Sequence, residues 1–460
     1  MSQSIKHHSV QCLIAAMLFS SHAFCQFTDF QFDIEEVVLP EGIGPSCIAF
    51  HDIDGDGHAD AVVAGRNLEG RIAVLSGGPD GSLSFDRELV GLGQTDWVEL
   101  VDLNDDGHVE IVMAIRDLEG GVQIFDGIAG GGFTETPRRL DAGREIRCLD
   151  VVDIDLDGDL DIVTLGHFSE DIRILAGDGT GHFEPSFRLR IAPWRNGYPF
   201  PQSFTLKDLD GDGTLDLATI SLGTSRLHLN RTIDGRFTSP TRSWQAPTIN
   251  AGDQGGCAYG VWADFDGDGR LSCLLPQTSF GPQWFALFEL DGSGSIQETT
   301  ILPGSTQGLS WYPAVGDFDG DGDPDVAIGH ALPGLVVFIE NDTTIPGPEE
   351  FLLPQTYFGF GFVRQLVTRD LDEDGDQDLV ALDFSQDKVI LMRNALVGGL
   401  AGEARPSRAT EPTTFDPSMV PHGTTLVKWL SDLMPEDARA LESSPPKRTS
   451  SPTSREGGSR

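Results

Sequence analysis

The nine residues Asp52-Ile-Asp54-Gly-Asp56-Gly-His58-Ala-Asp60 decide how this chain folds, because the same pattern occurs seven times. Successive copies start 50 to 56 residues apart. The other six copies begin at Asp102, Asp153, Asp208, Asp264, Asp317 and Asp370. A fixed period of this size indicates one supersecondary unit that is repeated along the chain, so the repeat has to be interpreted before any single residue.

Each copy carries oxygen-bearing side chains at alternate positions, with a glycine at position 6. Calcium takes six to eight hard oxygen ligands, and short loops with acids at alternate positions supply them. The glycine permits the sharp turn that wraps the chain around an ion. Four carboxylates this close would repel one another and raise each other's pKa without a cation. The pattern therefore predicts a calcium site in every copy.

We predict side-chain ligands at positions 1, 3, 5 and 9, and a backbone carbonyl ligand at position 7, where the residue type varies. Up to seven ions are expected. The fifth copy ends in Ser272 instead of an acid, so its site is predicted to be the weakest. The predicted metal residues are Asp52, Asp54, Asp56, His58, Asp60, Asp102, Asn104, Asp106, His108, Glu110, Asp153, Asp155, Asp157, Asp159, Asp161, Asp208, Asp210, Asp212, Thr214, Asp216, Asp264, Asp266, Asp268, Arg270, Asp317, Asp319, Asp321, Asp323, Asp325, Asp370, Asp372, Asp374, Gln377 and Asp378.

Three other interpretations of the acidic copies explain the sequence less well. Solvated turns are also rich in Asp and Gly, but seven copies in one register are hard to explain in that way. An EF-hand needs a glutamate at position 12, where this chain has residues such as Val63 and Met113. Nonapeptide β-helix repeats would have a much shorter period.

Four short apolar runs in each repeat predict four β-strands. In the first repeat they cover Ser46–Phe50, Ala61–Ala64, Arg71–Leu75 and Leu83–Leu89, separated by clusters of turn residues. Four strands in about fifty residues are typical of one blade of a β-propeller. Only two strands follow the last acidic copy, whereas Phe32–Leu39 resembles a fourth strand. We therefore predict an all-β, seven-bladed propeller whose N-terminal strand completes the last blade.

These acidic loops resemble the calcium loops of FG-GAP and VCBS-type repeats, as found in the propeller of integrin α subunits. The resemblance covers about Phe27–Gly399. It implies a seven-bladed propeller that holds Ca²⁺ at loop positions 1, 3, 5, 7 and 9. Proteins with such repeats include adhesins, lectin-like binders and some carbohydrate lyases and dehydratases, so the fold alone does not determine the function.

The two ends of the chain differ from the repeats. Residues 1–25 have the features of a secretory signal peptide, with Lys6 before the apolar run Val10–Phe19 and small residues near Cys25. We expect an exported protein: secreted, periplasmic or on the cell surface. Residues 26–400 form the predicted propeller. Residues 401–460 are rich in Ser, Thr, Pro and Arg, which predicts a disordered tail with a short amphipathic helix at Thr424–Ala440.

Charge and cysteine content narrow the classes of protein further. The formal net charge of −41 argues against nucleic-acid binding, which needs a basic surface. No other stretch is long and apolar enough to predict a transmembrane helix. Cys47 and Cys148 stand at equivalent places before their loops and are predicted to be small buried side chains. Pairing of Cys257 with Cys273 remains an open alternative.

The loops on the face opposite the acidic copies are the predicted ligand-binding surface, because rigid scaffolds carry binding residues on such loops. The candidate residues are Trp97, Arg116, His167, Trp194, Tyr198, Trp311, Tyr312 and His330. Aromatic residues that merely fill the mouth of the central channel are the alternative. Our first hypothesis is a recognition module for a glycan or an extracellular protein. The second is a carbohydrate-active enzyme, a polysaccharide lyase or a sugar dehydratase.

Overall fold

A computed structural model of the chain contains 32 β-strands, β1 to β32, in the residues that it describes. No helix occurs among these residues. The described residues are 32–191, 200–222, 226–230, 232–233, 235–238, 242–245, 259–276, 279–308, 310–330, 334–343, 355–358 and 360–394. All of them belong to one compact unit, Met1–Thr413. The second unit, Thr414–Arg460, the predicted signal peptide and the predicted tail lie outside the described residues.

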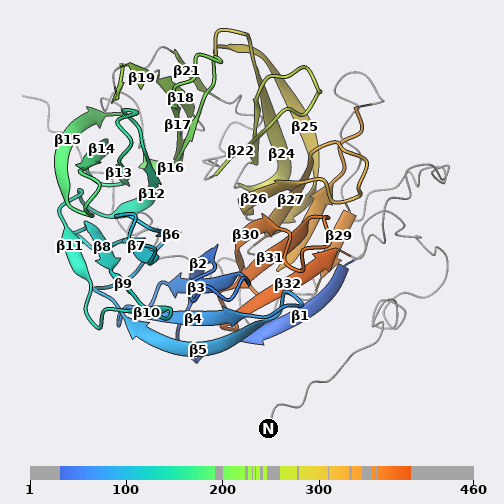
Figure 1. Ribbon diagram of the computed structural model, residues 1–460. Coiled ribbons are helices and arrows are strands. Elements are labelled where there is room, and N and C mark those ends of the chain that lie inside the picture. Colours follow the sequence, from blue (N-terminus) through green and yellow to red (C-terminus); the bar gives the residue numbers. More distant parts are fainter. Residues whose placement is uncertain are drawn as a thin grey trace, which may run out of the picture. The chain divides into compact units, whose positions relative to one another are not determined.

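Seven antiparallel sheets of four strands each form the blades of a β-propeller, arranged in a ring (Figure 1). Blades one to three follow one another without interruption in the chain. Blade one is β2 (Pro45–His51), β3 (Asp60–Gly65), β4 (Arg71–Gly77) and β5 (Leu83–Val90); blade two is β6 (Val98–Val101), β7 (Glu110–Ala114), β8 (Val122–Phe125) and β11 (Arg138–Leu140); blade three is β12 (Ile146–Val152), β13 (Asp161–Gly166), β14 (Asp171–Gly177) and β15 (Phe183–Arg190).

Blades four to six repeat this arrangement, and two short hairpins, β9–β10 (Gly127–Ile128, Gly132–Phe133) and β19–β20 (Thr232–Ile233, Arg236–Phe237), extend the turns of blades two and four. Blade four is β16 (Phe200–Lys207), β17 (Asp216–Leu222), β18 (Arg226–Asn230) and β21 (Arg242–Gln245); blade five is β22 (Val261–Ala263), β23 (Ser272–Pro276), β24 (Ser279–Leu290) and β25 (Ile296–Gly308); blade six is β26 (Ser310–Gly316), β27 (Asp325–His330), β28 (Leu335–Ile339) and β29 (Gln355–Phe358).

Blade seven closes the ring with strands from both ends of the propeller. It contains β30 (Val363–Arg369), β31 (Asp378–Asp383), β32 (Lys388–Asn394) and the N-terminal β1 (Phe32–Val38). β1 pairs with β32 along its whole length, from Phe32 opposite Asn394 to Val38 opposite Lys388. This confirms the predicted closure. β1 covers the free edge of β32, so blade seven is completed by a strand whose residues stand 350 to 362 positions before their partners in the sequence.

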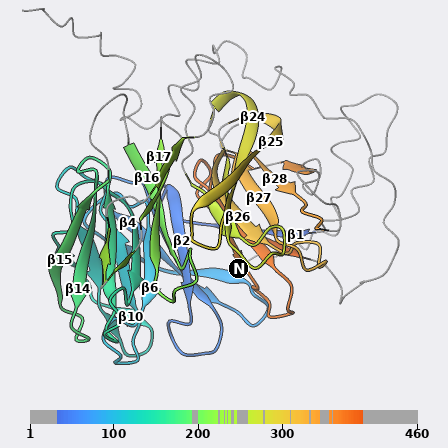
Figure 2. The ribbon, with the colours of Figure 1, turned by 90° about the horizontal axis from the view of Figure 1, so that it is seen from above.

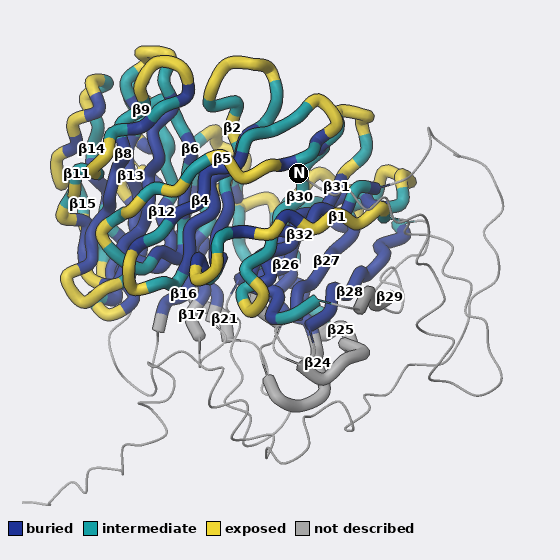
Figure 3. Tube along the Cα trace, turned by 90° about the horizontal axis from the view of Figure 1, so that it is seen from below, coloured by how far each residue is buried: buried dark blue, intermediate teal, exposed yellow. Residues whose placement is uncertain are grey.

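The second strand of a blade is buried on both faces, whereas the outermost strand is exposed on one face. All residues of β3, β13, β27 and β31 are buried, which explains their continuous apolar runs. β5 and β15 are mostly exposed or half-buried instead. Figure 3 shows the buried strands in dark blue and the exposed loops that join them in yellow.

The hydrophobic core lies between the blades. Among the described residues, seven separate clusters of buried apolar side chains each join two neighbouring blades. The cluster that closes the ring contains Val380 and Leu391 of blade seven together with Ile48 and Leu75 of blade one. Each blade therefore buries its two faces against its neighbours, so the ring is stabilised as a whole.

The observed strands match the sequence predictions closely in blade one, where β2 and β3 each extend the predicted ranges by one or two residues. Cys47 and Cys148 are buried, as predicted. The pairing of Cys257 with Cys273 involves a residue outside the described part and stays a prediction. No helix among the described residues has the length and apolar character needed to cross a membrane. Seen edge-on, β14 and β15 run from one face of the ring to the other (Figure 2).

Candidate metal centres and the opposite face

All seven acidic loops join the first strand of a blade to the second, and they share one backbone turn. In the first loop the Gly57 N–H donates to Asp52 Oδ2 at 3.0 Å. The equivalent glycine bonds to the equivalent Asp in each of the other six loops. The φ angles of these glycines lie between 82° and 99°. Glycine is favoured there because this left-handed region is costly for residues with a Cβ atom.

The turn brings carboxylate oxygens of each loop together. In the first, third, fourth and sixth loops, one oxygen from positions 1, 3 and 9 lies within 4.8 Å of the other two. These triads are Asp52–Asp54–Asp60, Asp153–Asp155–Asp161, Asp208–Asp210–Asp216 and Asp317–Asp319–Asp325. In the fifth loop the triad is Asp264, Asp266 and Asp268, because Ser272 occupies position 9. Aspartates at equivalent positions of repeats far apart in the sequence thus form similar groups of oxygens in these loops.

The seventh loop shows that these oxygens suit a hard divalent cation. Buried carboxylate oxygens of Asp370, Asp372 and Asp376 have no hydrogen-bond partner within the described part of the chain. A buried carboxylate oxygen without a donor is costly unless a cation neutralises it. Oxygen donors of this kind are the ligands that calcium prefers. The residues present therefore fit the metal that the sequence predicts.

The carboxylate at position 9 is buried and has two structural partners. In the sixth loop, Asp325 Oδ2 accepts the Phe318 N–H at 3.0 Å and Oδ1 accepts the Asn341 N–H at 2.9 Å. The first donor lies at position 2 of the same loop, and the second lies at the end of the third strand. Equivalent pairs of bonds hold Asp60, Glu110, Asp161 and Asp378. In these five loops, position 9 thus attaches the acidic loop to its own blade.

Burial and crowding of like charge raise the pKa values of these carboxyl groups. Burial is the larger cause for Asp325, whose pKa rises to about 9, and nearby carboxylates of the same loop add to it. The pKa of Asp378 rises to about 6 for the same reasons. The loops therefore hold negative charge at an energetic cost that either a proton or a cation would reduce.

In the last loop, position 7 counted from Asp370 is Asp376, and Gln377 stands at position 8. The Asp376 N–H donates to Asp374 Oδ1 at 3.1 Å, just as the His58 N–H donates to Asp56 Oδ1 at 2.8 Å. Asp376 therefore occupies the place that we assigned to Gln377. The backbone carbonyl of Gln377, one residue later, accepts the Asn394 side chain at 3.3 Å. Asp376 replaces Gln377 in the predicted ligand set.

The fifth loop contains a cation of its own. The Arg270 guanidinium lies against Asp268, with Nη2 and Nε at 2.6 and 2.8 Å from Oδ2. This ion pair occupies one of the carboxylates that a metal would use. Together with the missing acid at position 9, it gives a physical reason for the predicted weakness of the fifth site.

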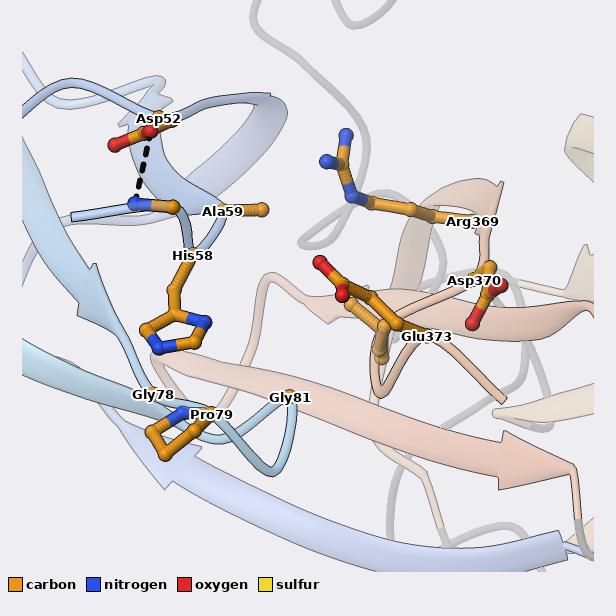
Figure 4. Close-up of a pocket in the computed structure, with 11 residues that line it drawn as sticks. Asp52, His58, Ala59, Gly78, Pro79, Gly81, Arg369, Asp370 and Glu373 are labelled. Carbon is orange, nitrogen blue, oxygen red and sulfur yellow. Dashed lines mark hydrogen bonds between the residues drawn. The ribbon is translucent and has the colours of Figure 1, made fainter. Parts of the chain in front are cut away.

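The first and seventh acidic loops lie close to each other where the ring closes. A small cavity of about 100 Å³ lies between the first and seventh loops (Figure 4). Asp52, His58 and Pro79 line it from blade one, and Arg369 and Glu373 line it from blade seven. The two loops on either side of the ring closure therefore border one space.

The opposite face carries a cluster of arginines around one buried carboxylate. Asp96 precedes β6, and its side chain is 1% exposed. Arg66 binds it through two nitrogens, at 2.5 and 2.9 Å. The remaining three arginines approach the same carboxylate at 3.3 to 3.4 Å and come from blades two, three and seven: Arg116, Arg147 and Arg364.

These charges shift one another's pKa values. Burial alone would raise the pKa of Asp96, but the four guanidinium groups hold it well below its usual range. Burial lowers the pKa of Arg364 to about 10, and the neighbouring charge of Arg66 adds to this effect. Glu145, which binds Arg147 at 2.7 Å, is a second carboxylate in the cluster. The cluster therefore links blades one, two, three and seven by ion pairs.

Aromatic side chains adjoin the arginine cluster. Tyr259 and Tyr312 stack with ring centroids 3.7 Å apart, and Trp97 packs against them. The Trp97 indole N–H donates to Glu99 at 2.7 Å. Three predicted ligand residues, Trp97, Arg116 and Tyr312, thus belong to one axial region.

The remaining predicted ligand residues are either buried histidines or residues whose side chains lie outside the described part of the chain. His167 is buried and its Nδ1 lies 2.9 Å from the Pro201 carbonyl oxygen. His330 is fully buried at the end of β27, and burial lowers its pKa to about 4. Trp194 and Tyr198 lie outside the described residues, as does the side chain of Trp311.

Arg147 and Tyr259 belong to the axial region but are absent from the predicted ligand set. The sequence does contain a signal for them. Asp96, Arg147 and Arg364 each stand six residues before the first Asp of their loops, whereas Trp97, Tyr259 and Tyr312 stand five before. Since the loops share one register, equal offsets place these side chains at equal heights on the innermost strands.

Comparison with known families finds five FG-GAP-like repeats in the chain. They cover residues 52–113, 102–164, 153–219, 208–275 and 278–328, so each match except the last runs from one acidic loop into the next blade. No curated protein matches the sequence.

Several solved structures have a similar fold. A protein from Lactobacillus plantarum is 13% identical with a TM-score of 0.54, covering 70% of this chain and 86% of that one. BBS1N in complex with ARL6DN is 13% identical with a TM-score of 0.51, covering 77% and 95%. An Agrocybe aegerita lectin that recognises non-reducing terminal N-acetylglucosamine is 19% identical with a TM-score of 0.46, covering 76% and 94%. At these identities the likeness concerns the fold alone.

Proposed function

We propose that this chain, which belongs to the family of proteins with FG-GAP-like repeats, is an exported, calcium-loaded recognition module. In this proposal the acidic loops bind calcium and stabilise the ring. The opposite face binds a glycan or an extracellular protein. The proposed calcium sites and the proposed ligand-binding face are on opposite sides of the ring, because the acidic loops and the arginine cluster lie at opposite ends of the inner strands.

The calcium part of the proposal is supported by the grouping of three carboxylate oxygens within 4.8 Å of one another in the first, third, fourth, fifth and sixth loops. A bound Ca²⁺ would supply positive charge to carboxylates whose pKa values are otherwise raised. The side chains at positions 1, 3 and 5 would hold it from the loop. The buried carboxylate at position 9 would hold it from the blade, since the same group is bonded to the third strand.

The observation that carries the recognition part is the arginine cluster beside a stacked tyrosine pair. Arginine and aromatic residues dominate the energetic centres of binding surfaces. Guanidinium groups donate several hydrogen bonds in fixed directions, which suits carboxylate and hydroxyl groups of a ligand. Aromatic faces suit the apolar faces of sugars and the side chains of peptides. These arginine and tyrosine side chains are buried, so a glycan or a protein segment would bind over this axial region and contact them only at their outer edges.

A carbohydrate-active enzyme at the same face is the second candidate, and one residue favours it. Glu99 lies beside Trp97, and burial raises its pKa to about 7. A carboxylic acid with such a pKa is suited to general acid–base catalysis near neutral pH. For an enzyme, Glu99→Gln would abolish turnover of a bound sugar. For a recognition module, Glu99→Gln would leave ligand binding intact. Neither the wild-type protein nor the variant would then turn over a sugar.

The recognition proposal is tested on a glycan array and on a panel of immobilised extracellular proteins, with the full chain in millimolar calcium. Arg116→Gln should weaken any binding at least tenfold, since Arg116 is part of the axial cluster. Arg139→Gln is the matched control, because Arg139 lies on an outer strand and pairs with exposed Glu119. Binding that responds equally to both changes would place the ligand elsewhere and overturn the proposal.

The calcium proposal is tested by thermal unfolding with and without chelator. A ligand at tenfold excess over its Kd stabilises the folded state by about 1.4 kcal/mol for each site. With several sites, removal of calcium should lower the Tm by more than about 10 °C. Magnesium at equal concentration is the control, since its demand for octahedral geometry suits these loops poorly. A Tm that is the same with and without calcium would contradict the proposal.

A further inference from the structure

Asn341 and Asn394 each contact two acidic loops at once. The Asn341 N–H donates to Asp325 of its own blade at 2.9 Å, whereas its side-chain amide donates to the Phe265 carbonyl of the preceding blade at 2.8 Å. Asn394 repeats both contacts one blade later. Its N–H donates to Asp378 at 2.6 Å, and its amide donates to the Phe318 carbonyl at 2.9 Å.

Both asparagines are buried, so these contacts are formed away from water. Asn341 is 0% exposed and Asn394 is 4% exposed. Each stands sixteen residues after the position 9 acid of its blade. A buried donor or acceptor that loses its partner costs more than an exposed one, because water does not replace the bond. We call these two pairs of hydrogen bonds the asparagine bridges. Because breaking them is costly, they hold neighbouring acidic loops in fixed positions.

We propose that Asn341 and Asn394 couple the calcium sites of blades five, six and seven, so that a cation in one loop raises the affinity of its neighbours. The proposal rests on the calcium binding proposed above and goes beyond it, because independent sites would simply add their effects. Asn341 joins loops five and six, and Asn394 joins loops six and seven. They act as positioning residues, since neither is a predicted metal ligand.

The coupling follows from the order in which groups become fixed. A cation in loop six would fix the Asp325 carboxylate, and with it the backbone of Asn341. The Asn341 amide would then hold the Phe265 carbonyl, which directly follows Asp264, the first ligand of loop five. Loop five would therefore lose less conformational entropy when its own cation binds. By thermodynamic reciprocity, a cation in loop five raises the affinity of loop six by the same factor.

Elsewhere in the ring, neighbouring blades meet at the acidic loops through close packing of turns. Gly81 of blade one lies so near loop seven that an added Cβ would stand 2.5 Å from the Leu371 carbonyl oxygen. Gly131 and Gly235 approach Asp54 and Asp155 of their preceding blades in the same way, at 2.7 and 2.2 Å. The turn between the third and fourth strands thus rests on the acidic loop of the previous blade, including at the ring closure.

The experiment is a calcium titration of the full chain by calorimetry, with bound metal counted by elemental analysis. The wild-type protein should bind with a Hill coefficient above one. Asn341→Ala and Asn394→Ala should each lower the calcium affinity of the adjoining sites about fivefold, near the low end of usual coupling factors. Asn230→Ala is the matched control. Asn230 is also buried, but its amide donates to Thr238 of its own blade at 2.7 Å.

A second set of variants tests the coupling without removing an asparagine. Asp319→Ala removes a ligand of loop six, and Asp155→Ala removes the equivalent ligand of loop three. At intermediate free calcium, coupled sites predict that Asp319→Ala loses more than one bound ion, because loops five and seven weaken as well. Asp155→Ala serves as the comparison, because no asparagine of this kind joins loop three to its neighbours among the described residues.

The outcomes separate the inference from the proposed function. Absence of calcium binding in the wild-type protein would overturn both. Calcium binding in independent steps, with Asn230→Ala and Asn394→Ala indistinguishable, would leave the proposed function standing and overturn the coupling. Thermal unfolding in saturating calcium checks that each variant is folded, so a loss of affinity is not mistaken for a loss of structure.

Discussion

Asp325 shows how one carboxylate can serve a metal site and the fold together. It is fully buried, it accepts backbone donors from its loop and from its third strand, and its pKa is raised to about 9. Such a group is costly when charged and alone, and favourable when a cation stands beside it. The same logic applies at Asp378, where the raised pKa is about 6. If the loops bind calcium as proposed, the charge state of such residues would connect calcium binding to the stability of the fold.

The first prediction concerns pH in calcium-free protein. A carboxyl group with a raised folded-state pKa contributes stability below its unfolded pKa, near 3.9, and that stability is lost as pH rises through the folded value. Calcium-stripped protein should therefore lose stability from about pH 4 to pH 9, the window set by Asp378 and Asp325. Thermal unfolding across this range measures it. In saturating calcium the loss should disappear, and an equal loss in both states would contradict the account.

The second prediction restores the missing acid of the fifth loop. Ser272 is buried at the start of β23, in the place that an acid occupies in the other loops. Ser272→Asp should increase the number of calcium ions retained at low free calcium by one, as measured by equilibrium dialysis. Ser84→Asp adds the same charge on the exposed face of β5 and should leave the count unchanged. An unchanged count in both variants would show that Arg270 alone limits this site.

At the scale of elements, the blade is the unit that the sequence repeats, but a blade alone cannot bury its two faces. The seven apolar clusters all lie between blades. The axial arginine cluster adds ion pairs that connect four of the seven blades. Because Arg364 and Asp96 are 268 residues apart, this connection forms only after the strands have assembled into a ring.

The third prediction tests that axial connection. Asp96→Asn keeps the shape of the side chain but leaves four buried guanidinium groups without their shared charge. Breaking a buried ion pair on one side costs about 3–5 kcal/mol, so denaturant unfolding should show a loss of this size. Asp86→Asn is the matched control, because Asp86 pairs with Arg87 on the surface and such pairs contribute less than about 1 kcal/mol. Equal effects would mean that the axial cluster does not stabilise the ring.

At the scale of the whole molecule, closure depends on one strand from the N-terminal end of the propeller. β1 covers the edge of β32, and Phe32 packs against Phe318 and Phe338 of blade six. Ion pairs from Lys388 to Glu36 and from Arg393 to Glu35 add to the contact. β1 thus covers the edge of β32 and becomes the outermost strand of blade seven, so backbone pairing between the two ends of the propeller closes the ring.

The fourth prediction removes this strand. A chain that starts at residue 39 lacks β1 and exposes the edge of β32, whereas a chain that starts at residue 32 keeps it. The shorter protein should unfold at a lower temperature and aggregate as its concentration rises, which light scattering during a thermal ramp would measure. The longer protein should behave like the full chain. Equal behaviour of the two truncated proteins would show that β1 is not needed for closure.

The sequence by itself determined the number of blades, the place of the acidic loops and the strand that closes the ring. These follow from local patterns: acids at alternate positions, a glycine that permits the turn, and apolar runs of strand length. Only the tertiary structure decided which side chains meet at the axis, such as Asp96 with Arg147 and Arg364, and that Asn341 and Asn394 bridge successive loops. Such contacts join residues far apart in the chain, so they depend on the curvature and register of the closed ring and not on any local pattern.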